Sequence, residues 1–187
     1  QKTAIIYNTF QMYRHDMLAN LSEAIGAAEA KNYYLGVKLV RGAYLEKERQ
    51  KAHEDEYSEP LHVCKEDTDR DYDLGVELCL KNIERVHFCM GTHNEASCLR
   101  LCDAMNALQI PHNHPNIYFA QLLGMSDNIS YNLAASGYNV AKYVPYGPVD
   151  AVMPYLFRRA EENSSIAGQT SREFALLQKE VNRRKTT

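Results

Sequence analysis

The sequence predicts an α/β protein of the (βα)8 TIM-barrel type, here with about five βα units and a C-terminal helix. Short apolar, β-rich runs alternate with longer amphipathic runs, which is typical of parallel sheets whose strands are joined by helices. Polar or glycine-containing segments follow each expected strand, and barrel active sites are built at these carboxyl ends. The five units would be the fourth strand to the eighth helix of a complete barrel of about 250 residues. A doubly wound sheet fits the alternation too, although no Rossmann fingerprint is present.

The first elements are predicted from composition and periodicity. The apolar run at 3–11 is expected to be a strand, and the Ala-, Leu- and Glu-rich run at 16–30 a helix capped by Asp16. A second strand is expected at 34–42. The run at 45–54 is dense in Lys, Arg and Glu and predicts a short extra helix before a long helix at 68–82.

The middle of the chain repeats the pattern. A third strand is expected at 86–91 and a helix at 94–108. The loop 111–115 contains two prolines and precedes a short fourth strand at 117–120.

The C-terminal part of the chain is expected to contain one more strand and three helices. We expect a helix at 126–135, a fifth strand at 138–144, and a helix at 148–163 whose first turn suits Pro148. A final helix is expected at 171–184. The prediction treats residues 1–187 as a portion of one catalytic domain, with 168–187 as its C-terminal helix.

Composition limits the class of protein. The chain has 187 residues, 45% of them hydrophobic and 24% charged, with a net charge of −3, which is ordinary for one soluble globular domain and argues against nucleic acid as a partner. No apolar run approaches the roughly 20 residues of a membrane span. Five cysteines without a CxxC pair indicate free thiols in a reducing compartment.

No metal site is predicted. Cys98 and Cys102 are four residues apart on an expected helix, and His112 and His114 flank one residue between prolines. Neither pair is accompanied by further ligands at a suitable spacing, so packing and loop roles are the better interpretation.

The adjacent arginines at 158 and 159 are the main candidates for binding an anion. Arg158 and Arg159 follow Tyr155, and Glu162 comes one helical turn later, where it can hold either guanidinium. A solvated helix face with an internal ion pair is the alternative. If the helix borders a site, two guanidinium groups can bind one small carboxylate or phosphate bidentately.

Five ordered motifs carry a resemblance to a known family. They lie at 38–44 (KLVRGAY), 91–94 (GTHN), 119–125 (FAQLLGM), 143–148 (YVPYGP) and 155–163 (YLFRRAEEN), in the same order and with similar spacing. The chain resembles proline dehydrogenase from about Thr9 to its end, and is most similar to the stand-alone form. The resemblance implies a distorted barrel that carries FAD, oxidises L-proline to Δ1-pyrroline-5-carboxylate and passes electrons to a membrane quinone.

The resemblance also assigns site residues. Arg158 and Arg159 would bind the substrate carboxylate, and the remaining substrate-binding side chains would be Tyr143, Tyr155, Leu122 and Tyr44. The cofactor-binding residues would be Gln11, Lys38, Val40, Gly42, Ala43, Thr92, His93, Asn94 and Glu162. No general base is evident among the seven histidines, so no catalytic proton acceptor is assigned.

Several expectations concern the whole protein. The family's first three βα units contribute an aspartate and a lysine to the pocket, and we expect them to be missing before Gln1, so that this chain alone binds flavin weakly. An exposed sheet edge favours pairing with a second copy. Localisation would be cytoplasmic, or peripheral on the inner membrane, in a bacterium and mitochondrial in a eukaryote.

Three alternatives stay open. The chain could be an inactive or incomplete barrel fragment of the same family. Its substrate could be hydroxyproline, which differs from proline by one hydroxyl group. A third alternative is another α/β enzyme that acts on an anionic substrate such as a phosphate, although no Gly-rich phosphate loop is present.

Overall fold

A computed structural model describes residues 3–165 and 169–185, except for the side chains of 158, 160–165 and 169–173. The chain forms two compact units, 1–143 and 144–187. The first contains β1 (Tyr7–Gln11), α1 (Met17–Ala30), β2 (Leu35–Val40), α2 (Leu45–Glu54), α3 (Lys65–Lys81), β3 (Val86–Gly91), α4 (Glu95–Ala107), β4 (Ile117–Leu122), α5 (Asp127–Ala135) and β5 (Val140–Tyr143). The second contains α6 (Val149–Ser165) and α7 (Gln169–Lys185).

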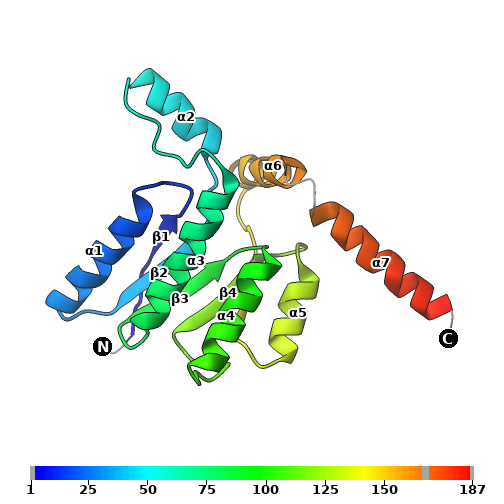
Figure 1. Cartoon of the computed structure of the whole chain (residues 1–187). Helices are drawn as coiled ribbons and strands as arrows, with labels where there is room; N and C mark the ends of the chain where they lie inside the picture. The colour runs from blue at the N-terminus through cyan, green and yellow to red at the C-terminus, as the bar shows by residue number, and fades with distance from the viewer. Residues whose placement is uncertain (1–2, 166–168, 186–187) are drawn as a thin grey trace. The chain divides into compact units, whose positions relative to one another are not determined.

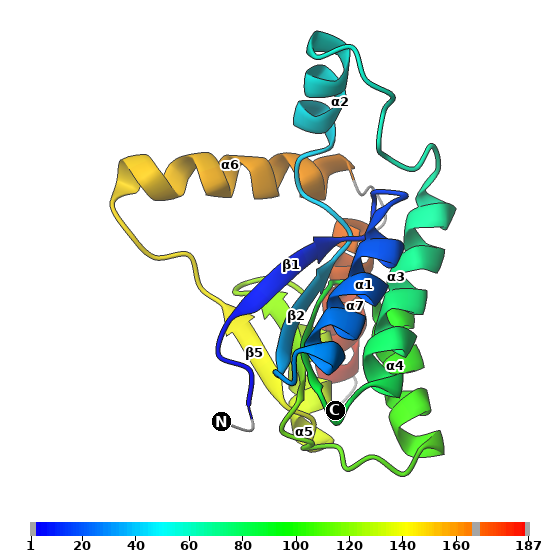
Figure 2. The same ribbon diagram turned by 90° about the vertical axis from the view of Figure 1, so that its left-hand side faces the viewer.

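The sheet of the first unit runs in sequence order. Its five strands are all parallel and adjacent as β1-β2-β3-β4-β5. Figures 1 and 2 show α1, α3 and α4 on the same side of the sheet. A doubly wound sheet reverses its strand order and carries helices on both faces, so this arrangement is that of an arc of a (βα)8 barrel.

The core lies between the sheet and these helices. Alternate strand residues point toward the helices, because successive side chains of a strand face opposite ways. Val37, Leu39, Phe88 and Met90 are fully buried there and pack with apolar side chains of α1, α3, α4 and α5. We call the other face of the sheet, turned away from α1, α3, α4 and α5, the inner face.

Most predicted elements are confirmed, with changed ends at the outer strands. The run expected as a strand at 3–11 enters the sheet only at Tyr7, which pairs with Gly36. Ile5 and Ile6 precede the first paired residue and are 71% and 80% exposed. The strand expected at 138–144 likewise shortens to Val140–Tyr143.

Asp16 occupies the N-cap position of α1 but does not cap it through its side chain. Its carboxylate instead accepts two hydrogen bonds from Arg14, at 2.9 and 3.0 Å. The guanidinium is a stronger donor to a carboxylate than a backbone N–H group, so it displaces the expected cap.

Candidate functional site

Small residues line the middle of the inner face. Gly91, Ala120 and Ala141 pair with one another across β3, β4 and β5. A Cβ atom on Gly91 would lie 3.1 Å from the Leu39 carbonyl oxygen and 3.7 Å from Cε of Lys38. The glycine therefore makes room for the Lys38 side chain. The alanines project only a methyl group each, so the neighbouring surface of the sheet is open as well.

Lys38 and Tyr143 come together over this floor. The Lys38 Nζ atom lies 5.3 Å from the centroid of the Tyr143 ring, within the range of a cation–π interaction. Cys89 pairs with Lys38 on the adjacent strand. Burial raises the pKa of the Cys89 thiol, and the nearby Lys38 charge opposes that rise. A cation thus lies on a partly buried surface that carries no carboxylate from the neighbouring strand positions.

Gln11 connects the ends of the first two strands. Its Oε1 atom accepts a hydrogen bond of 3.2 Å from the backbone N–H of Ala43. This contact brings together two predicted cofactor residues that are 32 positions apart. The carboxamide oxygen faces the chain, which leaves the amide nitrogen as the donor end of the side chain.

Packing and backbone conformation explain why residue 42 is a glycine. Its φ is +151°, and a Cβ atom there would lie 2.3 Å from the ring of Tyr13. The Tyr13 ring is buried, which raises the pKa of its hydroxyl to about 12. The need for glycine at this strand exit is therefore explained by Tyr13, without a cofactor.

The turn after β3 is held by its own side chains. The Thr92 hydroxyl accepts from the backbone N–H of Asn94 at 3.1 Å, and Asn94 Oδ1 accepts from Ser97 N, which caps α4. His93 points elsewhere, with Nδ1 3.0 Å from the hydroxyl of Ser126. Of the three residues predicted in this turn, Thr92 and Asn94 support the turn itself, and His93 has the side chain suited to a ligand contact.

Arg41 braces this turn from the helix side of the sheet. Its guanidinium donates to Asp69 at 2.6 Å, to the Thr92 hydroxyl at 2.9 Å and to the Ser97 hydroxyl at 3.0 Å. It also lies 4.3 Å from the centroid of the Tyr72 ring. Although burial opposes the effect, bonds from Lys65 and Arg41 lower the pKa of Asp69. Arg41 therefore ties β2, α3 and α4 together behind the site.

The loop between β4 and α5 is fixed by a lysine. Lys142 Nζ donates to the Met125 carbonyl at 2.8 Å and to Asp127 Oδ1 at 2.7 Å, with a longer contact of 3.4 Å to the Leu122 carbonyl. Gln121 is 2% exposed and donates to the Thr92 carbonyl at 3.2 Å. Leu122, predicted to face the substrate, is thus the last residue of β4 and leads into an ordered loop connected to the β3 turn.

The second unit contains the arginine helix. Within α6, the Arg159 guanidinium carbon lies 5.2 Å from the centroid of the Tyr155 ring, one turn earlier. These two predicted substrate residues therefore share one face of the helix. The side chains of Arg158 and Glu162 lie outside the described residues, and the convergence of the two arginines stays a prediction.

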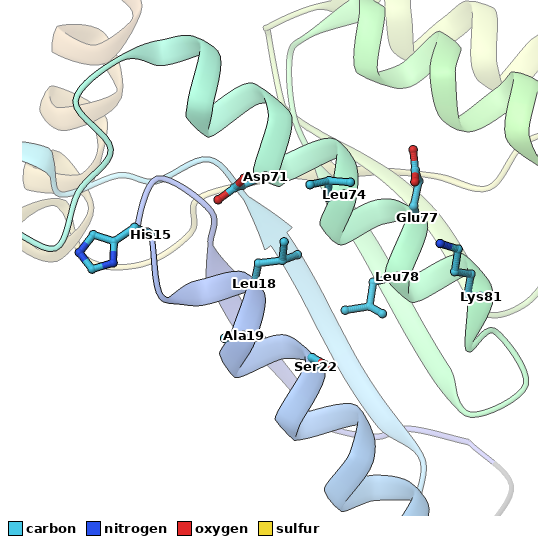
Figure 3. Close-up of a pocket in the computed structure, with 9 residues that line it drawn as sticks. All are labelled: His15, Leu18, Ala19, Ser22, Asp71, Leu74, Glu77, Leu78 and Lys81. Atoms are coloured by element: carbon cyan, nitrogen blue, oxygen red, sulfur yellow. The ribbon is translucent and has the colours of Figure 1, made fainter.

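A groove lies on the outer surface of the first unit, between α1 and α3. Figure 3 shows its lining residues, among them His15, Leu18, Asp71 and Lys81. None of the predicted site residues lines it, so it is separate from the inner face. In the described part of the chain, no three or more potential metal ligands gather in one place.

Sequence reasoning missed four polar residues that organise the site: Arg41, Gln121, Ser126 and Lys142. A signal was available for the first two. Strand alternation places Arg41 and Gln121 on the helix side of the sheet, where an uncompensated polar group is costly and a network is expected. Ser126 and Lys142 act across loops, and no local pattern points to their partners.

Three comparisons with known proteins were informative. The family model described as "Proline dehydrogenase" matches residues 1–172. The chain is 40% identical over 183 residues to hydroxyproline dehydrogenase of Xenopus laevis, covering 96% of this chain and 39% of that protein. It is 40% identical over 186 residues to mitochondrial proline dehydrogenase 1 of Homo sapiens, covering 98% of this chain and 31% of that protein.

A solved structure has the same fold. The crystal structure of proline utilization A from Bdellovibrio bacteriovorus, inactivated by N-propargylglycine, matches with a TM-score of 0.78 and 27% identity. The match covers 84% of this chain and 16% of that one. This likeness confirms the barrel-type fold. The chain spans well under half the length of these relatives. Their similarity therefore shows the family of this chain, and the activity of a whole protein is a proposal.

Proposed function

Because the chain belongs to the proline dehydrogenase family, we propose that the protein containing it oxidises L-proline to Δ1-pyrroline-5-carboxylate with a bound FAD. The observation that carries the proposal is the approach of Lys38 to Tyr143 on the inner face. The resemblance assigns one of them to the cofactor and the other to the substrate. Their proximity supports one continuous site for both.

The chemistry of the inner face fits a flavin. Lys38 supplies a cation, the Gln11 amide a donor, and the low floor at Gly91 and Ala120 room for a flat ring system. His93 adds a heteroaromatic donor or acceptor beside the strand ends. We assign the cofactor contacts to Gln11, Lys38 and His93, with Val40, Ala43 and Glu162 as further predicted neighbours. When bound, FAD supplies the acceptor for the hydride removed from the substrate.

The arginine helix would orient the substrate. Arg158 and Arg159 are proposed to bind the carboxylate, because two forked guanidinium groups fix both the position and the direction of a small anion. Tyr143, Tyr155, Leu122 and Tyr44 are proposed to surround the apolar ring. Holding the reacting carbon in one orientation lowers the barrier, since correct positioning replaces a chance encounter.

The choice between proline and hydroxyproline is a finer question. The chain is equally identical, at 40%, to a relative named for each substrate. We propose proline as the main substrate. Tyr143 is the residue that we propose discriminates between proline and hydroxyproline. A site without a committed hydrogen-bond partner for the extra hydroxyl rejects neither substrate strongly.

The remaining proposals concern the cellular setting. Relatives from Drosophila melanogaster and Homo sapiens are named mitochondrial, and we propose that location for a eukaryotic source. Quinone as electron acceptor, peripheral membrane association, and pairing with a second copy are proposed from the family alone. No helix in the part of the chain that the structure describes is long and apolar enough to cross a membrane. We also propose that 1–187 is one portion of a catalytic domain whose C-terminal helix, expected at 168–187, is described as α7 between Gln169 and Lys185.

The test is made on the natural protein that contains this sequence. The flavin is released and identified, and reduction of an artificial electron acceptor is followed with L-proline and with hydroxyproline. FAD together with proline-dependent reduction supports the proposal. A protein that carries FAD but reduces the acceptor with neither amino acid would contradict it and favour an inactive member of the family.

A further inference from the structure

Ser126 adopts a conformation that its position in the chain does not explain. It lies at the N-cap position of α5, is 2% exposed, and has a φ of +50°, in the left-handed region. Serine is a favoured N-cap because its hydroxyl can accept from the first backbone N–H groups of the helix. Here the hydroxyl makes no such bond. A residue in an unfavourable backbone conformation that also gives up its cap points to another function for the side chain.

That side chain is directed at His93. The Ser126 hydroxyl lies 3.0 Å from Nδ1 of the His93 ring, across 33 positions of sequence. The contact joins the turn after β3 to the loop after β4. A hydroxyl can donate to or accept from Nδ1, so the contact fixes the plane and direction of the ring whichever nitrogen carries the proton.

The backbone around Ser126 is held in place independently of this contact. Its carbonyl accepts from Ile129 N at 3.0 Å and Ser130 N at 3.1 Å. The Ser130 hydroxyl is 2.9 Å from Gln121 Oε1, and Lys142 holds the preceding Met125 carbonyl at 2.8 Å. Ser126 therefore offers a fixed hydroxyl to His93 rather than following the ring as it moves.

We propose that Ser126 is a positioning residue that sets the orientation of His93 for contact with the flavin. The inference rests on the proposed function, because it takes the cofactor contact of His93 from there. Ser126 itself need not touch the cofactor. Its effect on flavin binding is transmitted through the imidazole.

The test uses Ser126→Gly in the natural protein. Glycine adopts the left-handed region readily, so this variant removes the hydroxyl without adding backbone strain, and its thermal midpoint should not fall. Fluorescence titration of the apoprotein with FAD should show affinity reduced about three- to tenfold, as expected for one lost hydrogen bond. Gln109→Gly is the matched control, because Gln109 also has a left-handed φ, of +55°, and lies at the far end of α4. Its FAD affinity should equal that of wild type.

A double-mutant cycle with His93→Ala separates positioning from a general structural effect. We expect Ser126→Gly to have no further effect on FAD affinity once the imidazole is gone. An equal loss in both backgrounds, or no loss in the single variant, overturns the proposal. If His93→Ala alone leaves FAD affinity unchanged, the positioning role falls as well. The failure then lies in the cofactor contact assigned to His93 and not in its bond to Ser126.

Discussion

Lys38 on β2 and Tyr143 on β5 meet on the inner face, with the Lys38 Nζ atom 5.3 Å from the centroid of the tyrosine ring. Two strands, β3 and β4, separate them in the sheet. Their side chains can meet because Gly91 and Ala120 leave the surface between them low. A residue assigned to the cofactor and one assigned to the substrate thereby border the same space.

Replacing Lys38 by Met should weaken FAD binding by roughly tenfold or more, because a hydrogen bond from a charged group contributes about 1.5 to 3 kcal/mol. Titration of the apoprotein with FAD measures the effect. Lys38→Arg, which keeps the charge, should retain most of the affinity. Tyr143→Phe keeps the aromatic ring beside Lys38 and should bind FAD as wild type does. Wild-type affinity in Lys38→Met would remove Lys38 from the cofactor site.

The lysine on β5 leads to a different expectation. Lys142→Met removes the bonds to the Met125 carbonyl and to Asp127 and should loosen the loop that begins at Leu122. We expect the KM for proline to rise severalfold, with a smaller loss of FAD affinity because Ser126 follows Met125 in this loop. Asp127→Asn weakens only the ion pair and should have a smaller effect. A fall in flavin content with an unaltered KM would assign the loop to the cofactor instead.

Arg41 should matter chiefly for stability. Arg41→Met removes bonds to Asp69, Thr92 and Ser97 and should lower the free energy of unfolding by about 2 to 4 kcal/mol, measured by urea denaturation. Arg41→Lys keeps the charge but loses the fork, so it should be intermediate.

Arg100→Met is the control for Arg41, because the Arg100 side chain is 65% exposed and lies 3.4 Å from Asp73. It should change stability by no more than about 0.5 kcal/mol. Equal stabilities of Arg41→Met and Arg100→Met would show that the network behind the β3 turn adds nothing to folding.

His87 predicts a dependence of stability on pH. The residue is 5% exposed, its ring meets Tyr34 edge to face, and among the described residues its Nε2 has no hydrogen-bond partner. Burial, with a smaller contribution from His114, lowers its pKa below the ordinary 6.5. Because the folded state resists protonation, the stabilisation is complete above pH 6.5 and is lost as the pH falls below it.

His87→Phe keeps an aromatic ring at this position and removes the titrating group. Urea midpoints taken well above and well below pH 6.5 should therefore differ less in the variant than in wild type. The same difference in both proteins would mean that His87 is protonated as readily when folded as when unfolded.

Much of the fold follows from local pattern. The helix at 45–54 and the strand at 86–91 were predicted at their observed ends, because their boundaries coincide with changes in composition. The outer strands were predicted too long, because the apolar pattern continues beyond the residues that pair with the neighbouring strand. Ile5 and Ile6 are apolar and β-branched, yet they lie outside the sheet.

The site could be predicted only in part. Parallel strands end at one edge, so the clustering of Gln11, Lys38 and Leu122 near that edge is readable from sequence. The contact of Ser126 with His93 is not, because it depends on how two loops meet 33 residues apart. The roles of the arginine pair rest on the resemblance to the family, and the side chain of Arg158 lies outside the described residues.

We propose that the protein containing this chain oxidises proline held by its carboxylate. The most direct measurement is proline-dependent reduction of an artificial acceptor by the FAD-loaded natural protein, with Arg158→Met and Arg159→Met alongside. We predict activity in wild type and a KM for proline raised roughly ten- to a hundredfold in each variant, with flavin content preserved. Unchanged KM values in both variants, or no proline-dependent reduction by the loaded wild type, would show that the arginine pair does not hold a proline substrate.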